Sequence, residues 1–261
     1  MRVGPVIVAA VALGATAFAL DAQRVSLARA AVVKGEKLLA KGKLADAEKA
    51  FHSAIEIEAQ LPMSYLGLAR VLVSQQRFAD ALPVLEQAKD RYVAWEKLVR
   101  QTQLEIQQDA EKKARELTDL QTQQVSKIGP YGPSTAQQQT LNRTTAALSR
   151  ARTEDYLIKR EWRPEEFEAI PAEVFYLAGL ANARTGQREK GIDEWLLCIG
   201  LEPGNGLAHY NLAVAMFARG EVALAKEHLD DAVAAGVKPN PMFAADLQQA
   251  ARALAPMAPT P

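Results

Sequence analysis

Two stretches of this chain are each followed by a partial copy of themselves, and in both cases the copy lies 34 residues further on. Residues 35–59 align with residues 69–89, and residues 175–203 align with residues 209–239. The matched pairs include Leu38 with Leu72, Ala47 with Ala81, Phe51 with Leu85, Gly186 with Gly220 and Trp195 with Leu229. Recurrence at a fixed period of about 20–50 residues is typical of stacked repeats, in which each unit buries its apolar side against the next. The chain is rich in residues that favour helices, so the sequence predicts an all-α repeat fold.

Within each unit, small and large residues recur at fixed places. The first unit has small Gly35 and Ala47, large Phe51, and Gly42 at a turn. The third unit repeats this order with Gly179, Gly186, Gly191, Trp195 and Cys198. In this pattern the chain resembles the tetratricopeptide repeat family. The resemblance implies antiparallel helix pairs whose small residues allow close approach. The four repeats would lie near residues 28–61, 62–95, 172–205 and 206–239. Gln76 departs from the pattern, because it stands at the turn where the other units have glycine.

Between the two pairs of repeats, residues 91–163 fit no 34-residue register. Four apolar residues recur there every 11 positions, a spacing that places them along one narrow stripe of a nearly straight helix. These residues are Trp95, Ile106, Leu117 and Ile128. A Gly/Pro-rich stretch at residues 129–133 separates this helix from a second one near residues 135–160. We therefore expect a tetratricopeptide-repeat helical solenoid that is interrupted by a long, coiled-coil-like helical hairpin. The hairpin is either a solvated arm or an arm for self-association or partner docking.

The first 20 residues contain a single charge, Arg2, followed by an uncharged apolar run up to Leu20. Ala17 and Ala19 form an A-x-A pattern typical of a secretory cleavage site. Residues 1–22 are therefore predicted to be a signal peptide or, since about 18 apolar residues just reach spanning length, an N-terminal membrane anchor. Both readings place the rest of the chain outside the cytoplasm, in the periplasm or facing it. A third reading is a buried N-terminal helix of a soluble protein. The other predicted parts are two repeats at 28–95, the hairpin at 96–163, two repeats with a capping helix at 164–254, and a disordered tail at 255–261.

Few groups in the sequence are arranged for catalysis or metal binding. The 31 basic and 31 acidic residues balance, so no net field favours nucleic acid. His52, His209 and His228 have no cysteine or carboxylate at a spacing typical of metal ligands, and surface or packing roles are expected for them. Cys198, the single cysteine of the sequence, stands at a small-residue position and is expected in the core. We therefore expect no enzyme activity, no catalytic residue, no cofactor and no metal site.

By resemblance to the family, a partner polypeptide would lie in the concave groove that is lined by the first helix of each repeat. The resemblance assigns groove positions to Leu66, Arg70, Val73, Tyr176, Leu180, Arg184, Tyr210, Asn211, Val214 and Phe217. Such a surface is apolar and aromatic with a few arginine and asparagine groups, which suits an extended peptide or an amphipathic helix. The alternative is that Tyr176, Tyr210 and Phe217 pack against the neighbouring repeat or the end helix.

The predicted function is a non-catalytic scaffold or adaptor of the cell envelope that binds a protein or peptide in this groove. The alternative is a structural component that self-associates through the hairpin into a homo-oligomer. Contact with a membrane is expected only through the N-terminal segment.

Overall fold

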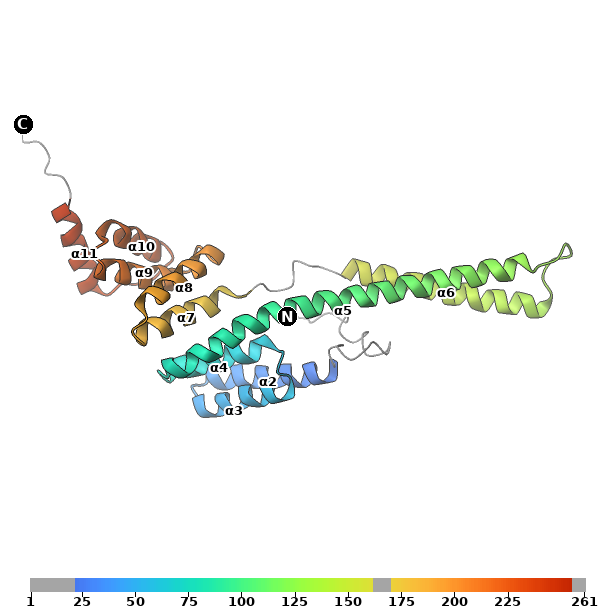
Figure 1. Cartoon of the computed structure of the whole chain (residues 1–261), viewed down its shortest axis with the longest axis horizontal. Helices are drawn as coiled ribbons and strands as arrows, with labels where there is room; N and C mark the ends of the chain where they lie inside the picture. The colour runs from blue at the N-terminus through green and yellow to red at the C-terminus, as the bar shows by residue number, and fades with distance from the viewer. Residues whose placement is uncertain (1–21, 162–169, 255–261) are drawn as a thin grey trace, which may run out of the picture. The chain divides into compact units, whose positions relative to one another are not determined.

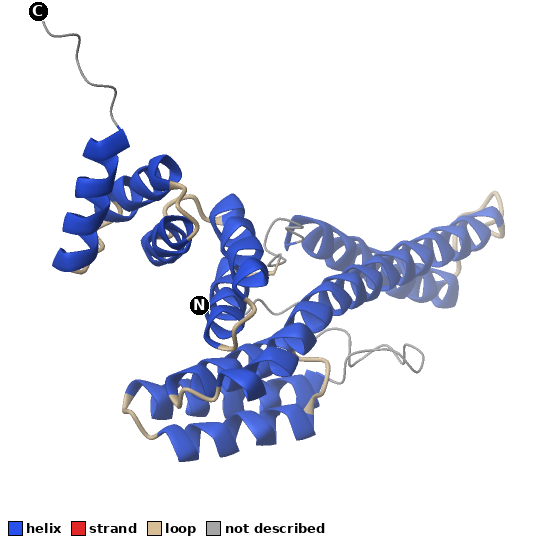
Figure 2. Ribbon diagram, turned by 60° about the vertical axis from the view of Figure 1, so that its left-hand side comes forward, coloured by secondary structure: helices blue, strands red, loops and turns tan. Residues whose placement is uncertain are grey.

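The computed structural model describes residues 22–161 and 170–254, and all regular secondary structure within these ranges is α-helical (Figures 1 and 2). The helices are α2 (Ala22–Ala40), α3 (Leu44–Ile57), α4 (Pro62–Ser74), α5 (Phe78–Ser126), α6 (Thr135–Glu161), α7 (Ala172–Arg184), α8 (Arg188–Leu201), α9 (Gly206–Ala218), α10 (Val222–Ala234) and α11 (Pro241–Leu254). The predicted all-α repeat fold is confirmed. The predicted signal peptide or anchor and the predicted C-terminal tail lie outside the described residues.

The described residues fall into two compact units. Residues 27–93 and 170–254 form the repeat unit, and residues 22–26 and 94–161 form the hairpin unit. Within the repeat unit, α3 and α5 begin 34 residues apart, and so do α7 and α9. The 34-residue offset of the sequence is therefore the period of a helix pair.

Phe51 fills the space between neighbouring helices of the first repeat pair. Its side chain is fully buried on α3, and its ring lies against Gly35 of α2 and Gly67 of α4. A Cβ atom on Gly67 would lie 2.1 Å from the Phe51 ring, and one on Gly35 would lie 2.8 Å from it. Only hydrogen fits at these two positions, so the small residues let α2 and α4 approach the ring from both sides.

Trp195 has the corresponding role in the second repeat pair. A Cβ atom on Gly179 would lie 2.4 Å from the indole nitrogen of Trp195. That nitrogen donates a hydrogen bond of 3.3 Å to the backbone carbonyl of Tyr176, so the buried polar atom of the ring is satisfied. Leu212 and Leu229 of the fourth repeat belong to the same buried cluster as Trp195. The third and fourth repeats therefore share one core.

The first helix of every repeat ends in the same way. The closing residue has a positive φ in each case: 70° at Gly42, 60° at Gln76, 86° at Gly186 and 79° at Gly220. The next amide donates back to the carbonyl five residues earlier, as from Arg77 to Leu72 at 2.9 Å. This pattern is a Schellman cap, which satisfies carbonyls that the helix leaves open and turns the chain toward the second helix.

Helix α11 covers the apolar side of the last repeat. Leu247 is almost completely buried, and the Phe243 ring makes edge-to-face contacts with the rings of Tyr210 and Phe217, which both lie on α9. The ring centroids are 5.8 Å and 5.7 Å apart, distances typical of favourable aromatic pairs.

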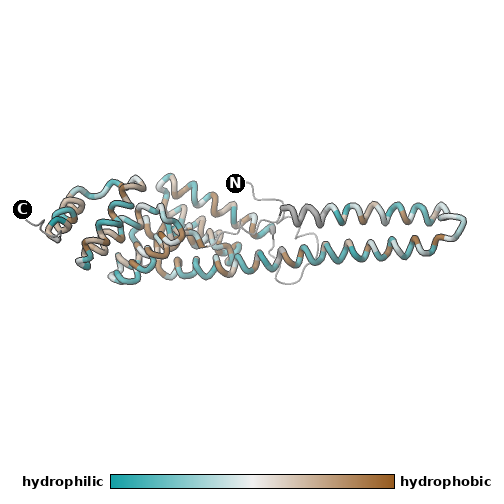
Figure 3. The backbone as a smooth tube through the Cα atoms, turned by 90° about the horizontal axis from the view of Figure 1, so that it is seen from above, coloured by the Kyte–Doolittle hydropathy of each residue, from teal (hydrophilic) through white to brown (hydrophobic). Residues whose placement is uncertain are grey.

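In the hairpin unit, a turn that contains Gly132 connects α5 to α6. The Gln121 side chain on α5 donates a 2.9 Å hydrogen bond to the Thr145 hydroxyl on α6. Buried side chains at Thr144, Leu148 and Ala151 give α6 one inner face. Much of both helices is hydrophilic, with short apolar segments between (Figure 3). Along the predicted stripe, Ile106 is buried, whereas Leu117 and Ile128 are half-buried. Coiled-coil-like packing along the hairpin stays a prediction.

Candidate partner-binding surface

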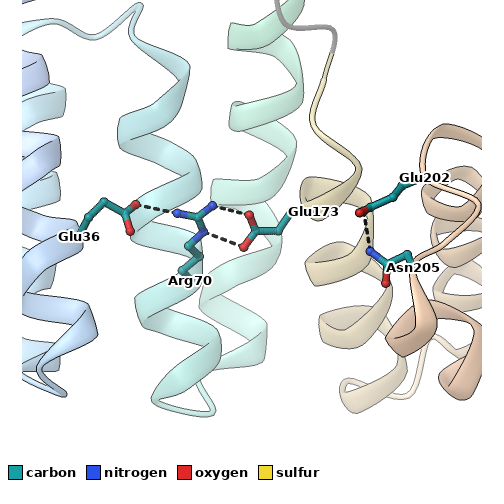
Figure 4. Close-up of polar contacts among 5 residues, drawn as sticks. All are labelled: Glu36, Arg70, Glu173, Glu202 and Asn205. Carbon is teal, nitrogen blue, oxygen red and sulfur yellow. Dashed lines mark hydrogen bonds and ion pairs between the residues drawn. The ribbon is translucent and has the colours of Figure 1, made fainter. Parts of the chain in front are cut away.

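Arg70 of α4 holds together the first helices of three repeats (Figure 4). Its guanidinium donates one hydrogen bond of 2.7 Å to Glu36 of α2 and pairs through two nitrogens with the carboxylate of Glu173 on α7. The hydrogen bond to Glu173 is the main reason that the pKa of Arg70 is raised. A two-nitrogen contact fixes the orientation of the pair as well as its distance. Repeat three therefore follows repeat two in the array, although the hairpin separates them in sequence.

Lys89 makes a second link between the two repeat pairs. Its ammonium group contacts the carboxylate of Glu194 on α8 and lies 5.3 Å from the centre of the Phe175 ring on α7. The Lys89 and Glu194 side chains are only 16% and 14% exposed, so water screens this ion pair less than a surface pair. The sequence left open whether the two repeat pairs stack. Within the repeat unit they are in direct contact.

Several predicted groove residues of the first and second repeat pairs take part in packing within the repeat unit. Leu66 is buried, and Arg70 is engaged with the two glutamates. Val73 and Leu180 are half-buried. Arg184 is exposed, and its guanidinium lies 5.9 Å from the centre of the Phe78 ring. Fewer of the predicted groove residues on α4 and α7 are therefore accessible to a partner than the sequence indicated.

Of the predicted groove residues on α9, Tyr210 and Phe217 pack against another helix, whereas Val214 is exposed. Tyr210 and Phe217 both contact Phe243 of α11, and the Tyr210 hydroxyl accepts a hydrogen bond from the Asn240 amide. These two rings therefore pack against the end helix, as the alternative interpretation of the sequence predicted. The Tyr176 hydroxyl on α7 is hydrogen-bonded to Asn211, while burial raises the pKa of Tyr176. The Val214 side chain is 41% exposed.

Sequence reasoning missed the two glutamates that Arg70 binds. Glu36 occupies the same place in its repeat as Arg70, and Glu173 occupies the second place of repeat three. Both are first-helix positions of the kind assigned to the groove, but the residues assigned to the groove are mostly apolar and aromatic. A search for opposite charges at these places on successive first helices could have found the link.

A comparison with known protein families identifies repeats in the same part of the chain. The family profile described as tetratricopeptide repeat matches residues 38–102, which span the second helix of repeat one and both helices of repeat two. Residues 38–102 are therefore tetratricopeptide repeats. Proteins with such repeats are generally non-catalytic scaffolds that bind protein partners. A comparison with curated protein sequences finds no significant match.

Solved tetratricopeptide-repeat structures resemble this repeat protein only distantly. YrrB, described as having an unusual peptide-binding site, is 16% identical over 84% of this chain and 90% of its own, with a TM-score of 0.28. PilF of Pseudomonas aeruginosa is 14% identical over 90% and 95%, with a TM-score of 0.35. A thermophilic repeat protein of Thermus thermophilus is 15% identical over 86% and 99%, with a TM-score of 0.34.

Cys198 is fully buried on α8 of the repeat protein. Burial raises the pKa of its thiol to about 11, and the nearby Glu202 carboxylate acts in the same direction. The neutral thiol is therefore the form present at physiological pH, which is unsuited to nucleophilic chemistry.

Two of the histidines are brought together by the fold. His209 on α9 and His228 on α10 are 19 residues apart in sequence, yet the fold brings their Nδ1 atoms within 3.1 Å of each other. The Asp231 carboxylate lies 3.6 Å from the same nitrogen of His209. The sequence spacing concealed this group, because its members lie on two antiparallel helices. His52 is exposed on α3 and does not belong to the group.

Among residues 22–161 and 170–254, no helix combines the length and the apolar character needed to cross a bilayer.

Proposed function

We propose that this tetratricopeptide-repeat protein is a non-catalytic scaffold of the cell envelope that binds a partner polypeptide along the first helices of its repeats. The observation that carries the proposal is the link through Arg70, which joins α2, α4 and α7 into neighbouring first helices. Neighbouring first helices offer one extended surface, and a single helix pair could not provide it.

The chemistry of that surface suits a peptide with apolar side chains. The side chains of Leu207 and Val214 on α9 are 52% and 41% exposed, and Val73 on α4 is half-buried. Asn211, on the same helix as Leu207 and Val214, supplies an amide group, and Arg184 on α7 supplies an exposed guanidinium group. A partner in an extended or amphipathic helical conformation can place apolar anchors on such a surface and pair its backbone or acidic groups with the polar ones.

A pair of valine substitutions on repeat four tests the proposal. Val214→Glu places a charge on the first-helix surface, and Val233→Glu places the same charge on the second helix α10, where the valine is 50% exposed. Untagged wild-type and variant proteins are coupled to a resin and used to capture partners from detergent-solubilised envelopes, with quantitative mass spectrometry as the readout. We expect Val214→Glu to lower capture of the enriched partner about tenfold, because a buried unpaired charge costs more than 1.4 kcal/mol. Equal losses with both variants, at unchanged helicity, would contradict the proposal.

A second candidate function is self-association through the hairpin unit. The side chains of Leu104, Leu120 and Val125 on α5 are 49%, 44% and 51% exposed. Exposed apolar groups of this size are suited to contact with another chain. Light scattering on the full chain, compared with a Leu120→Gln/Val125→Gln variant, tests this function. A concentration-dependent oligomer that the variant abolishes supports it, and a wild-type monomer at all concentrations refutes it.

For localisation, we propose export through residues 1–22. The support is the apolar run between Arg2 and Leu20 with small residues at Ala17 and Ala19. Intact-mass measurement of the protein recovered from its native host separates the two forms of the proposal: loss of about 20 residues indicates a cut signal, and the full mass in the membrane fraction indicates an anchor. Recovery of the full mass in the cytosol contradicts both.

A further inference from the structure

Helices α9 and α10 converge on a group of three side chains that the partner-binding proposal does not use. His228 and Asp231 are three residues apart on α10, so they lie on one face of that helix, and His209 approaches them from α9. One ligand atom from each side chain lies within 4.8 Å of the other two. The His209 side chain is 8% exposed, whereas that of Asp231 is 54% exposed.

A backbone contact fixes the proton of His209. Its Nε2 atom lies 3.0 Å from the carbonyl oxygen of Pro203, and a carbonyl can only accept a hydrogen bond. Nε2 therefore carries the proton, and Nδ1 presents its lone pair toward His228 and Asp231. A histidine that donates one ring N–H to a backbone carbonyl and directs the other nitrogen outward is the usual arrangement of a metal-binding imidazole.

Two of the three ligand-atom distances in the group are close to the edge length of a coordination tetrahedron, and the third lies within 4.8 Å. A zinc ion about 2.0–2.1 Å from each of two ligand nitrogens holds these nitrogens roughly 3.3 Å apart. The two Nδ1 atoms are 3.1 Å apart, and the Asp231 oxygen lies 3.6 Å from Nδ1 of His209. We propose that His209, His228 and Asp231 form a binding site for a divalent transition-metal ion, with zinc as the ion that best fits two imidazoles and one carboxylate.

The repeat architecture does not itself require these three residues. Thirty-four residues earlier, the same places in repeat three hold Phe175, Glu194 and Leu197. The donor set is therefore particular to repeat four. An ion held between α9 and α10 would link the two helices of the last repeat, and the exposed side of Asp231 leaves room for water as the fourth ligand.

Cobalt serves as the spectroscopic probe, because tetrahedral Co²⁺ absorbs visible light and occupies zinc sites. The untagged full-length protein is titrated with Co²⁺, and Zn²⁺ is then added as a competitor. We expect one equivalent of Co²⁺ to bind with a tetrahedral spectrum and one equivalent of Zn²⁺ to displace it. Zn²⁺ should also raise the melting temperature of the wild-type protein, because a ligand that binds only the folded state stabilises it.

Three variants decide whether this group is the site. His228→Ala and Asp231→Asn should each weaken Co²⁺ binding at least about tenfold, whereas His52→Ala, a matched loss of an exposed histidine, should leave it unchanged. Circular dichroism checks that the helices remain. If His228→Ala does not fold, the Asp231→Asn variant alone tests the metal site, because the Asp231 side chain is largely exposed in the wild-type protein. Absence of one-to-one binding, or equal weakening by His52→Ala, overturns the proposal.

Discussion

At the turn after α4, a glutamine adopts the left-handed backbone that glycines adopt at the three matching turns of the array. Gln76 has a φ of 60°, and its neighbours make the same Schellman hydrogen bonds as those at Gly42 and Gly186. A side chain in this conformation costs about 1–2 kcal/mol, because Cβ approaches the backbone. The fold tolerates the cost, since the core on both sides of the turn determines where the chain must reverse.

Gln76→Gly should therefore stabilise the protein by about 0.5–1 kcal/mol, since relief of the strained φ exceeds the extra freedom that glycine gives the unfolded chain. Urea unfolding followed by circular dichroism measures the change. The reciprocal variant, Gly186→Gln, should destabilise by a similar amount. If Gln76→Gly lowers the midpoint of unfolding, the glutamine side chain stabilises the turn and the prediction is wrong.

Cys198 gives a prediction that depends on pH. Its thiol pKa is raised to about 11, so at pH 8 the folded protein should contain about two orders of magnitude less thiolate than an unfolded chain. Alkylation by iodoacetamide should be correspondingly slow and become fast in urea. Because the folded state retains the neutral thiol, this contribution to stability is complete below about pH 9 and is lost as the pH rises toward 11. Rapid labelling of the folded protein at pH 8 would contradict the buried position.

At the scale of elements, the sequence predicted the helices better than their contacts. The 34-residue period placed the helix pairs, because the spacing of small and large residues follows directly from helix geometry. Gly67 shows the limit: it lies two residues before Ala69, the residue that aligns with Gly35, and only the structure reveals that the Phe51 ring requires a glycine at position 67. The partner of His209 could not be predicted, since His228 lies on another helix and 19 residues away, so the contact depends on how α9 and α10 pack.

Helix α11 provides a test at this scale. Phe243→Ala removes the ring that Tyr210 and Phe217 contact, and we expect a loss of about 1–3 kcal/mol, less than for a fully buried phenylalanine because the ring is half-buried. Hydrogen exchange should show faster opening in α9 and α11. Met242→Ala, at a side chain that is 76% exposed, is the control and should change little. Equal effects of the two variants would indicate that α11 does not stabilise the last repeat.

Across the repeat unit, stability depends on the contacts between repeats two and three. Arg70→Ala removes the contacts with Glu36 and Glu173, and we expect it to cost about 1–2 kcal/mol and to separate the unfolding of the two repeat pairs. Circular dichroism reports all helices, and pulsed labelling of Cys198 reports only repeats three and four. The two urea transitions should coincide in the wild type and diverge in the variant.

Arg77→Ala is the matched control for this prediction. Its ion pairs with Glu48 and Asp80 both lie before the hairpin, so its loss should lower stability slightly and leave the two transitions together. Coincident transitions in Arg70→Ala would show that other contacts, such as that between Lys89 and Glu194, are sufficient to couple the repeat pairs.

The distance in sequence between Arg70 and Glu173 also affects how the protein is made. These partners are 103 residues apart, so at about 5–20 residues per second a ribosome needs roughly 5–20 s to supply the second after the first. During that interval the nascent chain presents one edge of repeat two without its neighbour. A chaperone or a second nascent chain that reached this edge first would compete with repeat three, and slower translation of the hairpin would lengthen the exposure.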